Sequence, residues 1–176
     1  GASVQATVSG AGGTVSDSPL VVSDAIYRAS VGADGSLGAW QELPARLPEP
    51  SQWHGAVVAC ERLFVLGGAD TTYERNAVYQ APIYPDGSIG VWSEATPLPK
   101  TLITHQALPA RGGIVVVGGW HSGDQPIASQ RGVYWAPFDQ SCNLGSWQAQ
   151  PPLPFGPAYA ALAATASELV PIATWA

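Results

Sequence analysis

Short runs of apolar residues alternate with glycine, proline and acidic residues along this chain of 176 residues. GAVVA at residues 55–59 is followed by the pair Cys60-Glu61 and then by RLFVLGG at residues 62–68. Apolar runs of about five residues that are rich in β-branched side chains are typical of strands, because helices are usually longer. The two runs and their short connection therefore predict an antiparallel hairpin.

Two further runs extend the hairpin. NAVYQAPI at residues 76–83 predicts a third strand, and IGVWSEA at residues 89–95 predicts a fourth. Between them, PDGS at residues 85–88 predicts a tight turn, since an Asp-Gly pair supplies the positive φ values that such a turn needs. The PLP segment at residues 97–99 ends the fourth strand, because proline cannot donate to a sheet ladder. This stretch therefore predicts four antiparallel strands.

The four-strand unit recurs along the chain. The tyrosine of the predicted third strand and the tryptophan of the fourth each return at intervals of 52 and 55 residues. A glycine pair ends the predicted second strand in two units, and its first glycine follows a histidine, His54 or His105, by 13 residues. The anchors of the repeat are Trp40, Trp92, Trp147, Tyr27, Tyr79, Tyr134, Gly67, Gly68, Gly118 and Gly119. A period of about 50 residues over most of the chain predicts a repeat architecture.

The glycine pair after an apolar strand, the tyrosine and tryptophan anchors and the DGSLGAW turn at residues 34–40 resemble the kelch-type β-propellers of secreted bacterial proteins. These propellers are related in fold to that of galactose oxidase, and the resemblance covers residues 26–162. It implies an all-β fold of four-stranded antiparallel blades, with about three to three and a half blades in this chain. We therefore predict a single propeller domain over residues 1–176, with blades at about 1–48 (incomplete), 49–99, 100–154 and 155–176 (incomplete).

The ends of the chain are out of register with the predicted blades. Residues 1–11 match the first two strands of a unit poorly. Residues from Tyr159 onward match them better, with Ile172-Ala173 at the place of the glycine pair. A propeller ring needs about four to eight blades, and a partial ring leaves open sheet surfaces that promote association.

Three explanations of the partial ring stay open. Two copies can close a ring of about six blades, in which the C-terminal strands of one copy complete the N-terminal blade of the other. Copies can instead add head to tail into an open array, which happens when a contact between unlike surfaces does not close. In the third explanation, the chain is part of a longer polypeptide.

Composition narrows the range of partners. Hydrophobic residues make up 46% of the chain and charged residues 11%, and the net charge is −6. No nucleic-acid partner is expected, because binding to the phosphate backbone needs clustered cations. No membrane span is expected either, since no apolar run reaches the roughly 18 residues that a spanning helix needs. Seven tryptophans and a single lysine, Lys100, favour an extracellular or cell-surface protein.

No catalytic, cofactor-binding or metal-ligating residue is predicted. His54 and His105 hold equivalent positions in the repeat, which favours a structural role near the ring axis over a metal site. His121 lies in a predicted loop with Asp124, where it either serves ligand binding or is solvated. Copper chemistry of the galactose oxidase kind requires a cysteine linked to a tyrosine within a ligand set, and neither cysteine lies next to such a set. The acidic residues form no pair of the kind that a glycosidase needs, about 5–9.5 Å apart.

The two cysteines, Cys60 and Cys142, fall in predicted turns of neighbouring blades. We place the turn of Cys60 near the ring axis and the turn of Cys142 at the rim. Because a disulfide needs Cα atoms within about 7 Å, we expect no bond between them within one chain. Free thiols are the first expectation, and a disulfide between copies is the alternative.

Four aromatic residues outside the anchor set are candidates for surface binding: Trp53, Trp120, His121 and Trp135. An exposed tryptophan can stack on a sugar or pack on a partner, and packing between blades is the alternative. We predict a non-enzymatic extracellular module for protein interaction or self-assembly, whose incomplete end blades are completed by another copy or by the rest of a longer chain. The alternative function is a carbohydrate-binding or carbohydrate-active propeller fragment.

Overall fold

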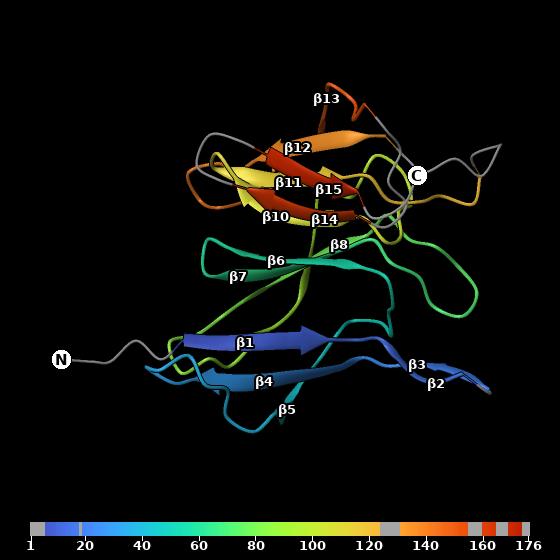
Figure 1. Cartoon of the computed structure of the whole chain (residues 1–176). Helices are drawn as coiled ribbons and strands as arrows, with labels where there is room; N and C mark the ends of the chain where they lie inside the picture. The colour runs from blue at the N-terminus through green and yellow to red at the C-terminus, as the bar shows by residue number, and fades with distance from the viewer. Residues whose placement is uncertain (1–5, 18, 124–130, 155–159, 165–168, 174–176) are drawn as a thin grey trace.

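The computed structural model describes residues 6–17, 19–123, 131–154, 160–164 and 169–173. These residues form antiparallel β-sheets and contain no helix, so the prediction of an all-β fold is confirmed. The three larger sheets are layered in chain order, from the N-terminal sheet in blue upward, and the C-terminal hairpin in red lies beside β10 of the last one (Figure 1).

Two inner sheets each contain four strands. The first joins β6 (Gly55–Ala59), β7 (Arg62–Leu66), β8 (Val78–Pro82) and β9 (Ser93–Ala95). The second joins β10 (Gln106–Ala110), β11 (Gly113–Val117), β12 (Val133–Pro137) and β13 (Gln148–Gln150). Each strand pairs with its neighbours in the chain, so both sheets are the antiparallel meanders that the repeat predicts.

The N-terminal sheet has three strands in the described residues, in the order β1 (Ala6–Ala11), β4 (Ala25–Val31) and β5 (Gln41–Arg46). A separate hairpin of β2 (Thr14–Asp17) and β3 (Leu20–Val22) lies between β1 and β4 in the chain. Because β1 runs directly into Gly12-Gly13 and pairs with β4, it corresponds to the second strands, β7 and β11. The described part of residues 1–11 thus forms a single strand, in agreement with the poor match of this stretch to the first two strands of a unit.

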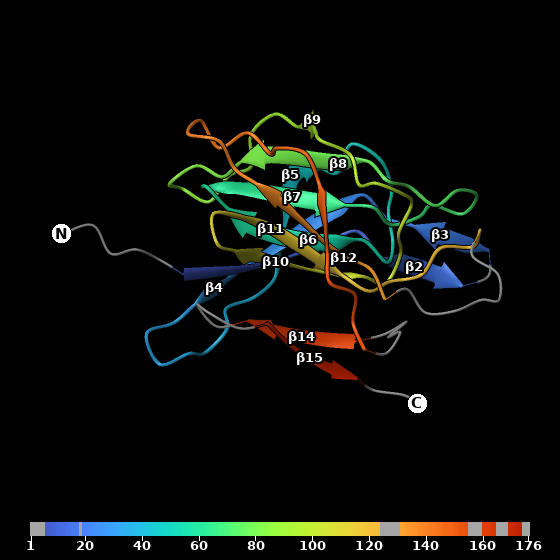
Figure 2. The same cartoon turned by 90° about the horizontal axis from the view of Figure 1, so that it is seen from above.

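The C-terminal hairpin consists of β14 (Ala160–Ala164) and β15 (Leu169–Ala173). Strand β14 lies beside β10, as β10 lies beside β6, so the hairpin corresponds to the first two strands of a unit (Figure 2). Ile172 and Ala173 pair with Ala161 and Ala160 inside this hairpin. The expectation that they replace the glycine pair is therefore wrong, and the register puts that place at residues 174–175, outside the described residues.

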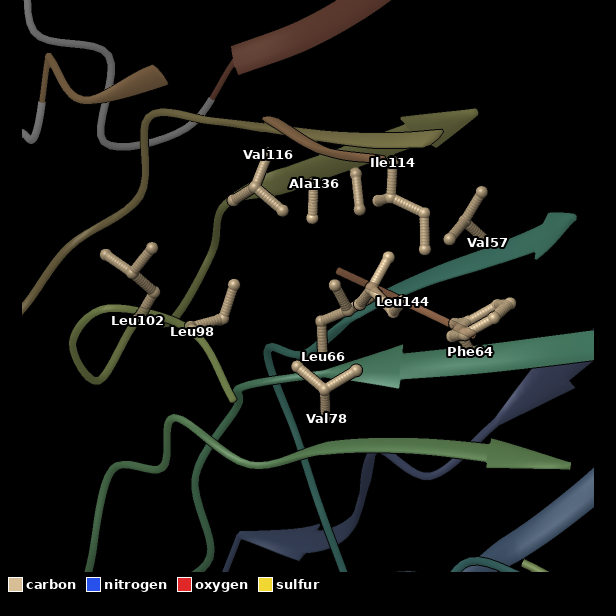
Figure 3. Close-up of a cluster of buried hydrophobic side chains, with 11 residues drawn as sticks. Val57, Phe64, Leu66, Val78, Leu98, Leu102, Ile114, Val116, Ala136 and Leu144 are labelled. Carbon is tan, nitrogen blue, oxygen red and sulfur yellow. The ribbon is translucent and has the colours of Figure 1, made fainter. Parts of the chain in front are cut away.

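Apolar side chains fill the spaces between the stacked sheets. Phe64 and Leu66 of β7 pack with Ile114 and Val116 of β11 in a cluster between the two inner sheets (Figure 3). The cluster between the N-terminal sheet and the first inner sheet contains Ile26, Leu43, Leu47, Leu63 and Val65. Strand β7 contributes to both clusters because successive side chains of a strand point to opposite faces. The unbroken apolar run in this strand thus reflects burial on both sides.

The glycine pair after β7 lies in a crowded turn. Gly67 and Gly68 have φ values of 58° and 89°, which favour glycine. A Cβ on Gly67 would lie 2.5 Å from the Leu102 carbonyl oxygen, and one on Gly68 would lie 2.5 Å from the Ser51 hydroxyl oxygen. The absence of side chains here lets the connections that enter β6 and β10 close over the end of β7.

Candidate interaction surfaces

The three repeat tryptophans hold the same place in their sheets but have different surroundings. Trp147 packs against the cluster between the inner sheets and donates a hydrogen bond from Nε1 to the Thr96 carbonyl oxygen, at 3.0 Å. Trp92 packs against the cluster that its sheet shares with the N-terminal sheet. Both side chains thus cover the sheet that precedes their own. No sheet in the described part of the chain precedes that of Trp40, and this residue is 52% exposed.

Two further repeat positions show the same difference. Leu144 is 6% exposed at the contact between the inner sheets, whereas its counterpart Leu37 is 57% exposed. Tyr134 packs against the inner cluster, whereas Tyr27 is 41% exposed. We call the surface formed by Tyr27, Leu37 and Trp40 the open face. Three positions whose counterparts at the contact between the inner sheets are buried or partly buried are therefore exposed on the N-terminal sheet.

The open face has a polar rim. The Tyr27 hydroxyl donates a hydrogen bond to Glu42 Oε2, at 3.2 Å, and the other Glu42 oxygen lies 2.6 Å from Arg46 Nη2. An apolar centre within a polar rim is the usual anatomy of a protein–protein interface.

A polar cluster lies at the loop ends of the two inner sheets, where the glycine pairs are. His121 Nδ1 is 2.5 Å from Thr101 Oγ1 and 3.2 Å from Glu74 Oε2. The main-chain N–H of Ser122 donates to the Glu74 carboxylate, at 3.1 Å from Oε2 and 3.2 Å from Oε1. The sequence singles out His121, but Glu74 and Thr101 lie 47 and 20 residues away from it and carry no local signal.

The polar groups of this cluster form hydrogen bonds with one another. Donors within the cluster reach both Glu74 oxygens, and the Nδ1 atom of His121 is engaged with the carboxylate and the Thr101 hydroxyl. Asp124, which the sequence places beside His121, lies outside the described residues. We therefore interpret the cluster as a structural hydrogen-bond network that holds the β7–β8 loop to the β11–β12 loop.

The three candidate tryptophans outside the anchor set lie in different surroundings. Trp53 is 53% exposed and has a φ of 58°, a conformation that is strained for a residue with a side chain. Trp120 is half-buried, and its indole N–H has no hydrogen-bond partner. Trp135 packs against Val115 and Val117 on the far face of the second inner sheet. The structure therefore places Trp120 next to His121, leaves Trp53 half open to solvent, and packs Trp135 on one face of its own sheet.

His54 and His105 are buried near the glycine pairs. A Cβ on Gly67 would lie 3.0 Å from the His105 ring, and one on Gly12 would lie 2.8 Å from the His54 ring. His105 is 2% exposed. Burial, and secondly the charge of His54, lowers the pKa of His105 to about 4, although the carbonyls of Leu66 and Leu102 oppose this shift. Burial also lowers the pKa of His54, so both imidazoles are neutral near pH 7.

The aspartates of the repeat turns are hydrogen-bonded within their own turns. Asp34 and Asp86 accept hydrogen bonds from the hydroxyl and main-chain N–H of Ser36 and Ser88, which lower the pKa of each carboxyl. These exposed carboxylates hold their own turns. No group of three or more histidine, cysteine, aspartate or glutamate residues is placed to hold a metal ion among the described residues.

Cys60 and Cys142 form a disulfide within the chain, with Cα atoms 6.0 Å apart. The expectation of no intrachain bond is wrong. The β12–β13 turn leans over the preceding sheet, where Leu144 joins the inner cluster and its carbonyl accepts a hydrogen bond from Thr96 Oγ1, at 2.6 Å. This tilt brings Cys142 to the β6–β7 turn that holds Cys60.

Comparison with known sequences finds no family model that matches this chain, and no curated protein shows significant similarity to it. Within the described residues, no helix is long and apolar enough to cross a membrane.

Proposed function

We propose that this chain is a partial β-propeller of kelch-type blades that serves as a non-enzymatic module for protein interaction and self-assembly. One observation carries the proposal: side chains of the repeat that are buried or partly buried between the inner sheets are exposed on the open face. The same residue types at the same positions bury themselves wherever a preceding sheet is present. The open face is therefore suited to receive another sheet of the same kind, from another copy or from further chain.

The energetics support a contact there. Covering the exposed half of a tryptophan removes about 100 Å² from water, which contributes on the order of 2 kcal/mol. A few such anchors at the centre of a contact supply most of its binding energy, with a polar rim that excludes water. Trp40 and Leu37 fit the role of anchors, and Glu42 and Arg46 fit the role of the rim.

The disulfide supports an extracellular or cell-surface setting for this module. Disulfides persist in oxidising compartments and are rare where glutathione keeps thiols reduced. The bond joins residues 82 positions apart, so it holds two sheets together rather than one turn.

A second candidate function, carbohydrate binding, rests on Trp53. An indole that is half open to solvent can stack on the apolar face of a sugar ring. Titration of the chain with neutral oligosaccharides tests this candidate, and loss of the heat signal in Trp53→Ala would support it.

Sedimentation velocity over a wide range of protein concentration tests the main proposal. We expect the wild-type chain to associate, and the double variant Leu37→Ser/Trp40→Ser to remain monomeric. Tyr73→Ser is the control, because Tyr73 is an aromatic residue on the β7–β8 loop, outside the open face, and is even more exposed than Trp40. A wild-type chain that stays monomeric at every concentration contradicts self-assembly.

A further inference from the structure

The Cys60–Cys142 disulfide joins two turns that belong to neighbouring sheets. Cys60 is exposed in the β6–β7 turn, and Cys142 is partly buried in the β12–β13 turn. Exposed disulfides exchange with dissolved thiols more readily than enclosed structural ones do. Of the two cysteines, Cys60 is therefore the one that a thiol in solution can reach more easily.

The contact that the disulfide spans is also held by other interactions. Leu144 is buried in the cluster between the inner sheets (Figure 3). Thr96 Oγ1 donates a hydrogen bond to the Leu144 carbonyl oxygen, at 2.6 Å, and the Trp147 indole N–H donates to the Thr96 carbonyl oxygen, at 3.0 Å. None of these interactions involves a cysteine, so they persist when the disulfide opens.

The equivalent contact one sheet earlier forms without a disulfide. There the β8–β9 turn leans over the N-terminal sheet, with Gly87 at the position that Cys142 holds in its own turn. Trp92 packs against the cluster between these two sheets, and Arg28 Nη1 donates a hydrogen bond to the Asp86 carbonyl oxygen, at 3.0 Å. Docking of such a turn therefore does not require a covalent bond.

The backbone on both sides of the disulfide is left-handed. The φ value is 51° at Cys60, 55° at Glu61 and 60° at Cys142. Glycine holds the position of Glu61 in the β10–β11 turn, where Gly112 has a φ of 69°. Left-handed backbone at residues with a side chain costs free energy and is frequent at functional sites. Opening the bond frees Cys142 to leave this conformation, which favours exchange.

We infer that the Cys60–Cys142 disulfide is a site of thiol–disulfide exchange with small thiols. The thiolate of the small thiol attacks the Cys60 sulfur and forms a new sulfur–sulfur bond with it. The bond between Cys60 and Cys142 breaks, and its electron pair leaves with the Cys142 sulfur as a thiolate. The product has the small thiol attached at Cys60 and a free thiolate at Cys142.

The modification is reversible without any other reactant. The Cα atoms of the two cysteines are 6.0 Å apart, and the remaining contacts between the sheets keep them at a distance that a disulfide can bridge. Attack of the Cys142 thiolate on the Cys60 sulfur restores the disulfide and releases the small thiol. This chemistry is independent of association through the open face.

Incubation of the folded wild-type chain with glutathione at neutral pH tests the inference. Iodoacetamide added at the end of the incubation alkylates the Cys142 thiol and so traps the product for peptide mass spectrometry. We expect glutathione at Cys60 roughly tenfold more often than at Cys142, because access to the sulfur governs which one is attacked. Without iodoacetamide, removal of glutathione should restore the disulfide.

Two results would overturn the inference. One is a disulfide that reacts with glutathione only when urea unfolds the chain, which indicates a purely structural bond. The other is an adduct found mainly at Cys142. Near-UV circular dichroism of the trapped product should remain native-like, because Leu144 and Trp147 keep their contacts. Loss of this signal at the rate of the reaction also contradicts the inference.

Two variants with one cysteine each measure the access of the two sulfurs directly. Cys142→Ser leaves a thiol at Cys60, and Cys60→Ser leaves a thiol at Cys142. We expect iodoacetamide to alkylate the Cys60 thiol roughly tenfold faster, because Cys60 is the more exposed residue. Equal rates would contradict attack at Cys60. The experiment with glutathione uses the wild-type chain, so it does not depend on the folding of either variant.

Discussion

The contact between the two inner sheets and the open face of the N-terminal sheet contain residues at matching repeat positions. These residues differ in their exposure to solvent. Trp147 and Leu144 are covered by the preceding sheet, whereas Trp40 and Leu37 face solvent. The local turns are alike, since Asp34 and Asp139 each accept hydrogen bonds from their own turn. The difference teaches that a repeat position encodes the capacity for a contact, while a neighbouring sheet decides whether that capacity is used.

Truncation of the two matching tryptophans, Trp147 and Trp40, should give the largest difference in stability between the two regions. We expect Trp147→Ala to lower the free energy of unfolding by about 3 kcal/mol, because it opens the inner cluster and leaves it unfilled. Trp40→Ala should change the unfolding free energy of the monomer by less than about 1 kcal/mol, because its side chain is half solvated already. Urea denaturation at a concentration where both proteins are monomeric measures the difference. Equal losses would show that the open face is packed.

The turns between the third and fourth strands differ at one position, which in one turn is a disulfide-bonded cysteine. Cys142 has a φ of 60° at the position where the other two turns have Gly35 and Gly87, with φ values of 83° and 77°. Removing the disulfide through Cys60→Ser should cost about 2–4 kcal/mol of unfolding free energy. Cys142→Gly should cost about 1 kcal/mol less, because glycine relieves the left-handed backbone at that site. Paired denaturation curves give the two values, and identical losses would mean that the turn is unstrained.

The pH dependence of stability probes the buried histidine beside the inner sheets. The pKa of His105 is about 4 in the folded chain and about 6.5 when unfolded, so the unfolded chain binds the proton more tightly. Stability is therefore complete above about pH 6.5 and falls by about 3 kcal/mol as the pH drops to 4, below which this group has no further effect. His54 acts in the same direction. Unfolding free energies of wild type and His105→Gln across this range measure the contribution, and equal slopes would refute it.

The smallest effect tests one hydrogen bond that ties the second inner sheet to the first. Thr96 Oγ1 donates to the Leu144 carbonyl oxygen. Thr96→Val keeps the shape of the side chain and removes the donor, so we expect a loss of about 1 kcal/mol. Thr96→Ser, which keeps the hydroxyl, is the matched control. Thermal melts of the two variants resolve the difference, and a neutral Thr96→Val would mean that the carbonyl finds another donor.

Much of the fold follows from local signals in the sequence. The apolar runs before Gly67 and Gly118 locate the second strands, and in two units an Asp-Gly turn separates the third strand from the fourth. Those signals are strong because strand length, turn chemistry and burial on both faces act within a few residues. The end sheets are harder to predict, because β1 contains small polar residues and its identity depends on its pairing with β4.

The candidate surfaces depend on residues far apart in the chain, so the sequence predicts them only in part. The sequence identifies Tyr27 and Trp40 as members of a repeat, and it cannot say that they are exposed while their counterparts are covered. The Glu74–His121 contact and the Cys60–Cys142 bond join residues 47 and 82 positions apart. Such contacts are set by the tilt of one sheet against the next, which no local pattern records.

The sequence by itself determined the repeat, the strands and the chemistry of each repeat position, because these depend on the alternation of side chains and on turn residues. The tertiary structure decided which of those positions are buried and which sheet each tryptophan covers. It also joined the two cysteines, which the repeat pattern assigns to separate turns. The physical reason is that burial belongs to a pair of surfaces: Trp147 and Trp40 differ by the presence of a sheet in front of them.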